Sequence, residues 1–127
     1  MSYINIKISG VPYSKLKSRG DFLALERWNE AVRSQTRDLP RISEACILKV
    51  TFLLPPDKYP KNLPYGPDPD NLLKRFLDLL NETVFYDARG CDSCVVSIHA
   101  MKTRVETTAE AGAALEILPV SVEISDC

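Results

Sequence analysis

Two prolines, Pro67 and Pro69, separate an extended part of the chain from an amphipathic one. Each proline fixes its own φ and drives the preceding residue out of the α region, so residues 66–69 are expected to be extended. A helix is then expected over residues 71–81, because its apolar residues fall on one stripe: Leu72, Leu73, Phe76, Leu77 and Leu80. Asp70 is the expected N-cap of this helix.

The rest of the pattern predicts an α+β fold. Alternation or continuous apolar runs predict about four strands: residues 4–8, 45–54, 94–104 and 115–124. The last two strands are joined by a small-residue loop around Gly112. A second helix over residues 21–38 places Trp28 in the core. We therefore expect a single small domain over residues 1–127, with two main helices packed on a mixed or antiparallel sheet.

Acidic residues stand at the start of the helix expected over residues 71–81. Asp68 and Asp70 are two positions apart and project to the same side if the segment is extended, roughly 7 Å apart at Cα. Two carboxylates spaced in this way can bind one hard cation, which prefers oxygen ligands. Lys74 lies one helical turn beyond Asp70. In the alternative interpretation, Asp70 only caps the helix, Asp68 only forms a turn and Lys74 is a solvated surface charge.

A second acidic cluster follows at residues 87–92, where a turn containing Gly90 leads into the strand expected over 94–104. Asp92 lies where the chain enters that strand, and a carboxylate at a rigid strand end is well placed to complete a metal site. Asp87 is the competing residue, and its alternative role is to form the turn.

These motifs, taken in order, resemble the RusA family of Holliday junction resolvases. The likeness is carried by Asp-Pro-Asp-Asn-Leu-Leu-Lys at 68–74, Leu-Asp-Leu-Leu at 77–80, Asp-Ser-Cys-Val-Val at 92–96 and then Lys102. The family carries a D-x-D-N-x-x-K run, an L/F-D-x-L helix, and a D-D-x-x-V-V segment that leads to a late lysine. The resemblance implies that Asp68, Asp70 and Asp92 bind Mg²⁺, with Mn²⁺ as the alternative ion. It also implies that Lys74 is essential for cleavage.

The chain departs from the family pattern in two ways. Cys91 occupies the first of two adjacent positions at which the family usually has acids. The connection from the helix to this segment is also a few residues longer than usual, which keeps Asp87 as a rival to Asp92. We favour Asp92, because Val95 and Val96 follow it in the register of the family.

The four cysteines do not suggest a disulfide framework in a chain of this kind. The Cys91-x-x-Cys94 pair lacks the two further ligands that a structural zinc site needs, and His99 is the only histidine. We interpret this pair as incidental small residues and Cys46 as a core residue of its strand.

Charge is unevenly distributed along the chain. All 16 Lys and Arg residues lie at or before Arg104, whereas 12 of the 17 acids do, so residues 1–105 carry a formal charge of +4 although the net charge is −1. A mildly basic body permits a DNA partner without requiring one. Because no apolar run reaches membrane-spanning length and the amino end lacks the plan of a signal peptide, we expect a cytoplasmic protein with no membrane partner.

These observations lead to the hypothesis of a Mg²⁺-dependent endodeoxyribonuclease that resolves four-way DNA junctions by paired nicks. Paired nicks in opposing strands need two active sites related by a two-fold axis, so a homodimer is expected. The exposed side of the motif helix, with Leu73 and Leu79, is a candidate for its interface.

Three alternatives remain open. The first is a junction-binding or single-strand-binding protein that has lost catalysis, motivated by Cys91. The second is a small protein-interaction domain whose acidic carboxyl-terminal tail contacts a basic partner. The third keeps the metal site but acts on a nucleotide or a flap structure.

Overall fold

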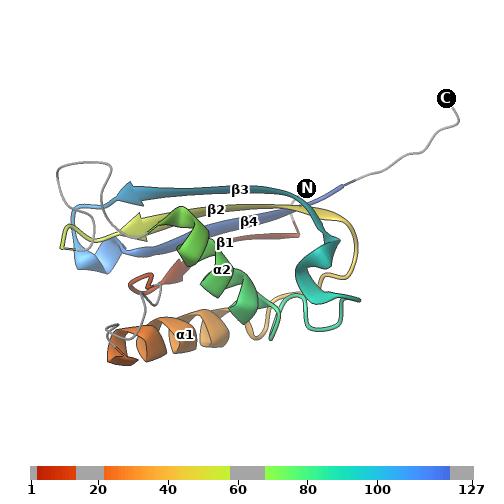
Figure 1. Cartoon of the computed structure of the whole chain (residues 1–127), viewed down its shortest axis with the longest axis horizontal. Coiled ribbons are helices and arrows are strands. Elements are labelled where there is room, and N and C mark those ends of the chain that lie inside the picture. Colours follow the sequence, from red (N-terminus) through yellow and green to blue (C-terminus); the bar gives the residue numbers. More distant parts are fainter. Residues whose placement is uncertain (1–2, 14–21, 58–67, 121–127) are drawn as a thin grey trace, which may run out of the picture.

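A computed structural model of the chain describes residues 3–13, 22–57 and 68–120. This part of the chain forms two helices and four strands (Figure 1). They are β1 (Ile4–Ser9), α1 (Phe22–Thr36), β2 (Cys46–Leu54), α2 (Pro69–Leu80), β3 (Val95–Arg104) and β4 (Gly112–Pro119). Two short 3₁₀ turns, η2 (Cys91–Cys94) and η3 (Thr108–Glu110), flank β3. The predicted α+β class, with two main helices and a four-stranded sheet, is confirmed.

The sheet is mixed and has the order β1-β4-β2-β3. β4 pairs antiparallel with both β1 and β2, whereas β2 and β3 are parallel. A parallel pair needs a crossover connection, because the chain must return to the starting end of the sheet. α2 lies in this crossover: it begins near the arrowhead end of β2 and descends toward the turn before β3 (Figure 1). The two ends of α2 therefore lie near opposite ends of the parallel strands.

One face of the sheet is covered by the helices, and the other is open. Along β2 every second residue is buried, from Cys46 to Leu54, and Lys49 between them is exposed. This period of two is the signature of a strand with one face in the core. His99 pairs with Lys49 and is exposed on the open face.

Three aromatic rings join the layers of the molecule. The ring of Phe76 on α2 stacks on that of Trp28 on α1, with centroids 6.3 Å apart and planes at 22°. The same ring meets Phe52 on β2 edge-on, at 5.6 Å and 88°. All three side chains are buried, and Trp28 is only 1% exposed, so its predicted place in the core is confirmed. Phe76 thus fixes α2 to both the sheet and α1.

The carboxyl ends of the two helices are tied together by polar contacts. The buried hydroxyl of Thr36 donates to the carbonyl oxygen of Val32 at 2.7 Å and lies 2.9 Å from the hydroxyl of Thr83. Because the proton of Thr36 is used in the first bond, Thr83 must donate in the second. At the surface, Arg33 forms a bidentate ion pair with Glu82 at 2.9 and 3.2 Å. These contacts hold the end of α1 against the turn that follows α2.

Two predicted boundaries are wrong. α2 starts at Pro69 rather than at residue 71, because proline is well suited to the first helical position, where its missing N–H is not needed. β4 starts at Gly112, which was expected in a loop, and ends at Pro119. The part of the expected last strand beyond Val120 lies outside the described residues.

The apolar stripe of α2 is wider than predicted. Leu79 is 1% exposed and packs in the core beside Phe76 and Leu80, so it cannot form part of an exposed dimer interface. Leu73 is half-buried and packs against the same core. An interface built on Leu73 and Leu79 is therefore wrong, because the protein's own sheet and α1 already cover this side of the helix.

No helix in the described residues is long and apolar enough to cross a membrane.

Gly112 provides a test of the packing between β4 and β1. A Cβ atom at this position would overlap the backbone carbonyl oxygen of Ile8, which cannot move without breaking the strand pair. We expect Gly112→Ala to lower the free energy of unfolding by more than about 2 kcal/mol, measured by urea denaturation. Ala114→Ser, at an exposed position of the same strand, is the control and should change it by less than about 0.5 kcal/mol. Equal stability of the two variants would contradict this close approach.

Cys46 provides a pH test of the core. Its side chain is fully buried, and burial raises the pKa of the thiol from 9.0 to about 12, with a smaller contribution from the neighbouring Cys94. Between pH 9 and pH 12 the folded chain therefore keeps a proton that the unfolded chain loses, so the free energy of unfolding falls as the pH rises through this window. Between pH 8 and pH 10 the wild type should lose about 1 kcal/mol more than Cys46→Ala in urea denaturation. Equal losses would show that the thiol ionises in the folded state.

Candidate active site

The first turn of α2 carries two exposed carboxylates. Asp68 is the N-cap residue, with φ −68° and ψ 136°, and its side chain makes no capping hydrogen bond. Pro69 follows at the start of the helix, and Asp70 lies within its first turn. Asp70 is therefore not the N-cap that the sequence predicted, and Asp68 holds that position without using its carboxylate for it. Both carboxylates are exposed and can accept an external ligand.

Lys74 lies on the same side of α2 as Asp70. The two residues are four positions apart, which places their Cβ atoms roughly 5–6 Å from each other on a helix. Lys74 and Asp78, a further four residues along, are exposed, as is Asn71 beside Asp70. The exposed side of α2 thus carries acid, base and acid in sequence above the buried apolar stripe.

Lys102 on β3 lies at the same end of the sheet as the first turn of α2. It pairs with Phe52, and Phe52 contacts Phe76. Asp70 is six residues before Phe76, roughly 9 Å farther along the helix axis and toward the carboxyl ends of β2 and β3. Lys102 is half-buried on the helix-facing side. In the sequence, Lys102 was assigned no role beyond its part in the family resemblance. Its position beside the first turn of α2 follows from the pairing of β3 with β2.

Asp92 lies at the other end of α2. It belongs to η2, immediately before β3, and is half-buried. Asn81, the C-cap residue of α2, donates its side-chain N–H to Asp92 Oδ2 at 2.9 Å. Asp87 is exposed in the turn between Asn81 and η2, so both rival acids follow the carboxyl end of the helix. Asn81 fixes the orientation of the Asp92 carboxylate, a role that the sequence did not reveal, because the partner is known only from the fold.

The length of α2 separates these acids. From Asp70 to Asn81 the helix rises by roughly 16 Å, whereas oxygen ligands lie about 2.0–2.6 Å from a bound Mg²⁺ or Ca²⁺. Among the described residues, no group of three or more His, Cys, Asp and Glu side chains is close enough to hold a metal ion. One chain therefore brings Asp68, Asp70 and Lys74 together but leaves Asp92 apart. Within one chain, Asp68 and Asp70 can supply two carboxylate ligands to a divalent cation. Asp92 is too far away to be the third ligand of the same ion.

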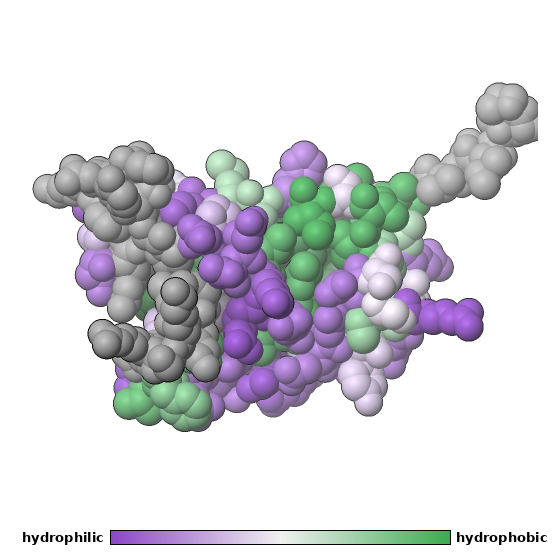
Figure 2. Space-filling view, viewed as in Figure 1, coloured by the Kyte–Doolittle hydropathy of each residue, from purple (hydrophilic) through white to green (hydrophobic). Residues whose placement is uncertain are grey.

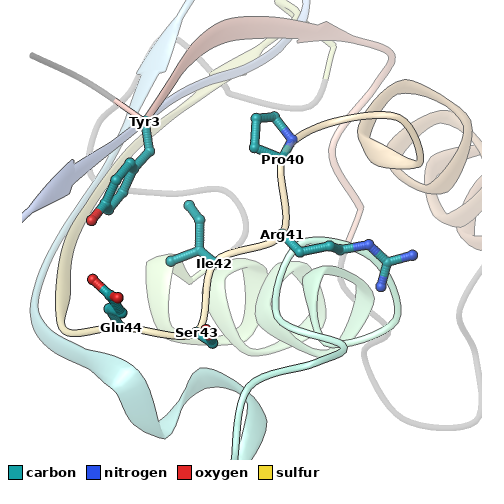
Figure 3. A pocket seen from close by; sticks show the side chains of 6 residues that line it. All are labelled: Tyr3, Pro40, Arg41, Ile42, Ser43 and Glu44. Carbon is teal, nitrogen blue, oxygen red and sulfur yellow. The ribbon is translucent and has the colours of Figure 1, made fainter.

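A separate hollow of about 220 Å³ lies along the segment that joins α1 to β2. It is lined by Tyr3, Pro40, Arg41, Ile42, Ser43 and Glu44, with the carboxylate of Glu44 turned toward the ring of Tyr3 and Arg41 turned away (Figure 3). The guanidinium of Arg41 instead lies 5.3 Å from the centre of the Tyr86 ring. None of the predicted site residues lines this hollow, so it is not the site of the acid chemistry.

Comparison with known proteins assigns most of the chain to one family. Residues 23–117 match the family model described as endodeoxyribonuclease RusA. The matched span contains both ends of α2 and the whole of β3, and hence all four predicted site residues. A search of curated proteins found no match.

Asp68 offers a test of whether its carboxylate is structural. Because it makes no capping bond, Asp68→Ala should lower the free energy of unfolding by less than about 0.5 kcal/mol. Thr107→Ala is the control: Thr107 forms a reciprocal capping box with Glu110, and its loss should cost about 1 kcal/mol. Urea denaturation of both variants measures the difference. A larger loss for Asp68→Ala than for Thr107→Ala would assign Asp68 a capping role.

Proposed function

The chain belongs to the endodeoxyribonuclease RusA family, and we propose that it is a divalent-metal-dependent nuclease that resolves four-way DNA junctions by paired nicks. The observation that carries this proposal is the exposed group of Asp68, Asp70 and Lys74 on the first two turns of α2, within the matched span. Two exposed carboxylates, followed by a cation one turn later, are suited to phosphodiester hydrolysis.

Asp68 and Asp70 would hold a Mg²⁺ or Mn²⁺ ion at the amino end of α2. When bound, such an ion polarises water and neutralises charge on the phosphate. Lys74 would contact a non-bridging phosphate oxygen and stabilise the negative charge that develops during cleavage. Lys102 lies at the same end of the sheet and would add to the positive potential there. Asn71 flanks the group and would help to orient it, whereas Asp78 is an exposed charge one turn beyond Lys74.

The family and the distribution of charge support a DNA substrate. Phosphate contacts supply most of the affinity of a protein for DNA, and the resulting affinity falls steeply with salt. Exposed cations of the described residues include Arg27 on α1, Arg37 just after it, and Lys7 and Lys49 on the open face of the sheet. A four-way junction presents two equivalent strands to be cut, which matches an enzyme with two symmetric active sites.

A binding protein without catalysis is the second candidate. It is favoured by Cys91, which stands where the family usually has an acid, and by the separation of Asp92 from the carboxylates of α2. Such a protein would bind four-way junctions in a salt-dependent way and leave their strands intact.

Strand nicking of a synthetic four-way junction in Mg²⁺ tests the proposal. We expect symmetric paired nicks by the wild type, and a loss of about 10²-fold or more in nicking rate for Asp70→Asn and for Lys74→Ala. Asp78→Asn is the control, because it removes a charge from the same exposed side of α2 one turn beyond Lys74. It should retain nicking within roughly threefold of the wild type.

Three other results would each change the assignment. Binding without nicks in both Mg²⁺ and Mn²⁺ would reject the enzyme and favour the binding protein. Equal cleavage of flap, duplex and junction DNA would keep the nuclease and reject junction selectivity. Equal losses in Asp78→Asn and Asp70→Asn would show that the acid pair at the start of α2 has no special role.

A further inference from the structure

Two cysteine thiols meet where β2 and β3 begin. Cys46 is the first residue of β2 and pairs with Val95, the first residue of β3, so Cys94 directly precedes the residue opposite Cys46. The thiols of Cys46 and Cys94 are joined by a hydrogen bond. Neighbouring strands lie about 4.8 Å apart and each residue advances about 3.3 Å, so a residue next to a paired one lies roughly 6 Å away at Cα. This distance is within the range that a disulfide spans.

One of the two thiols can be reached from solvent. Cys46 is fully buried, whereas Cys94 is half-buried in η2. In the view of Figure 2 an apolar patch covers the part of the surface where β3 begins, and Val96 there is 61% exposed. A charged oxidant loses hydration on an apolar surface without gaining a partner. A small uncharged oxidant therefore reaches Cys94 more readily than a charged one.

We infer that Cys46 and Cys94 form a modification site, in which a hydroperoxide joins their sulfur atoms in a disulfide and the new bond displaces Asp92. The effect on activity rests on the proposed function, whereas the formation of the disulfide does not. This pairing differs from the Cys91-x-x-Cys94 motif of the sequence, because the fold places a cysteine of another strand against Cys94.

The reaction consumes one molecule of hydrogen peroxide. The sulfur of Cys94 attacks one peroxide oxygen, the O–O bond breaks, and water leaves behind a sulfenic acid. The sulfur of Cys46 then attacks the sulfur of Cys94, the S–O bond breaks, and a second water leaves with the thiol proton. The two thiols lose two electrons and two protons in total, which the peroxide takes up. Burial raises the pKa of both thiols, so the first step is slow, and the second depends on the nearness of the sulfur atoms.

Closing the bond moves η2 rather than β2. A disulfide holds its sulfur atoms about 2.05 Å apart, closer than a hydrogen bond does. β2 lies between β4 and β3 in the sheet, and its Cys46 is in the core. η2 is a turn of four residues outside the sheet, and its first residue, Cys91, has a left-handed φ of 52°. Because a densely packed strand resists displacement more than a short turn does, Cys94 is the residue that moves.

Asp92 is coupled to Cys94 through the backbone of η2. The N–H of Val95 donates to the backbone carbonyl oxygen of Asp92, which closes a loop around Cys94. The carboxylate of Asp92 accepts from Asn81 at 2.9 Å. A shift of η2 therefore changes the position of this carboxylate, and a misplacement of about 1 Å can lower a rate by roughly 10²-fold. Oxidation lowers the activity of the acid site in this way, and a thiol reductant restores it.

Peptide mapping of the oxidised wild type tests the disulfide. Trypsin cleaves after lysine and arginine, so Cys46 lies on the peptide of residues 42–49, and Cys91 and Cys94 share the peptide of residues 90–102. After treatment with hydrogen peroxide and then N-ethylmaleimide, we expect the two peptides to be linked in the mass spectrum and to separate on reduction with dithiothreitol. A bond confined to the peptide 90–102, or no bond at all, would overturn the inference.

Cysteine variants identify the partner of Cys46. Cys94→Ser should abolish the link, whereas Cys91→Ser, at another half-buried position of η2, is the matched control and should keep it. The opposite pattern would assign the bond to Cys91 and overturn the pair. Circular dichroism shows that both variants fold. Fragmentation of the linked wild-type peptides locates the bond without any variant.

The displacement of Asp92 can be measured apart from nicking. The side-chain amide of Asn81 donates to this carboxylate, so its ¹⁵N NMR signal should shift when the wild type is oxidised. The same signal should stay in place when Cys94→Ser is treated with peroxide. An unchanged Asn81 signal in the linked wild type would overturn the displacement.

Junction nicking separates this inference from the proposed function. We expect the wild type to lose at least about tenfold in nicking rate after peroxide treatment and to regain it with dithiothreitol. Cys94→Ser should keep its rate within roughly twofold under the same treatment. A linked wild type with an unchanged rate would overturn the control of the acid site. A reduced wild type that never nicks would reject the proposed function and leave the disulfide standing.

Discussion

The packing of Phe76 determines the geometry of the whole molecule. Its ring lies between Trp28 of α1 and Phe52 of β2, so one side chain sets the position of α2 relative to both the other helix and the sheet. The contacts of Thr36 with Thr83 then fix the rotation of the helices at their carboxyl ends. Because protein cores are packed as densely as crystals, α2 cannot slide along the sheet without opening a cavity at Phe76. Asp70 and Lys74 of the candidate site are carried by this helix, Asp68 precedes its first residue, and Asp92 is bonded to Asn81 at its carboxyl end.

The parallel pairing of β2 and β3 explains why the acids on either side of α2 lie apart. The chain leaves the carboxyl end of β2, and α2 brings it back toward the amino end of β3. Asp68 and Asp70 precede this crossing, and Asp92 follows it. Asp68 and Asp70 are thus held at one end of a rigid helix and Asp92 at the other. The rigid helix also gives each of these acids a defined position.

Much of the fold could be predicted from local patterns, and the failures have physical causes. The apolar run of residues 45–54 and the apolar stripe of α2 were sufficient for the strand and the helix, whereas the sequence left open whether the sheet is mixed or antiparallel. Gly112 was predicted to lie in a loop, because glycine is common in loops. The reason for a glycine in this strand is the close backbone of Ile8, which only the folded structure shows. Leu79 was placed outside, because the width of a buried stripe depends on how many partners a helix has.

The residues of the candidate site could be identified from the sequence, but their positions relative to one another could not. The motif residues 68–74 were found from their spacing, yet the spacing could not show that Asp68 takes the N-cap position without using its carboxylate. The contact between Asn81 and Asp92 joins residues 11 apart through a turn of irregular backbone, for which no periodicity exists. The place of Lys102 depends on the register between β2 and β3, which is a property of the completed sheet.

The order of strands also has a consequence for synthesis of the protein. In the sheet, β1 pairs only with β4, and Ile4 lies opposite Ile117. The first strand therefore cannot pair until the last strand is present, roughly 110 residues later in the sequence. β4 in turn separates β1 from β2, so no earlier part of the chain can close the sheet without it. A chain still growing on the ribosome therefore lacks the central strand of its own sheet, and folding must follow translation rather than accompany it. A truncated chain that ends before β4 could not complete this sheet. Such a chain would remain unfolded and would be degraded by cellular proteases.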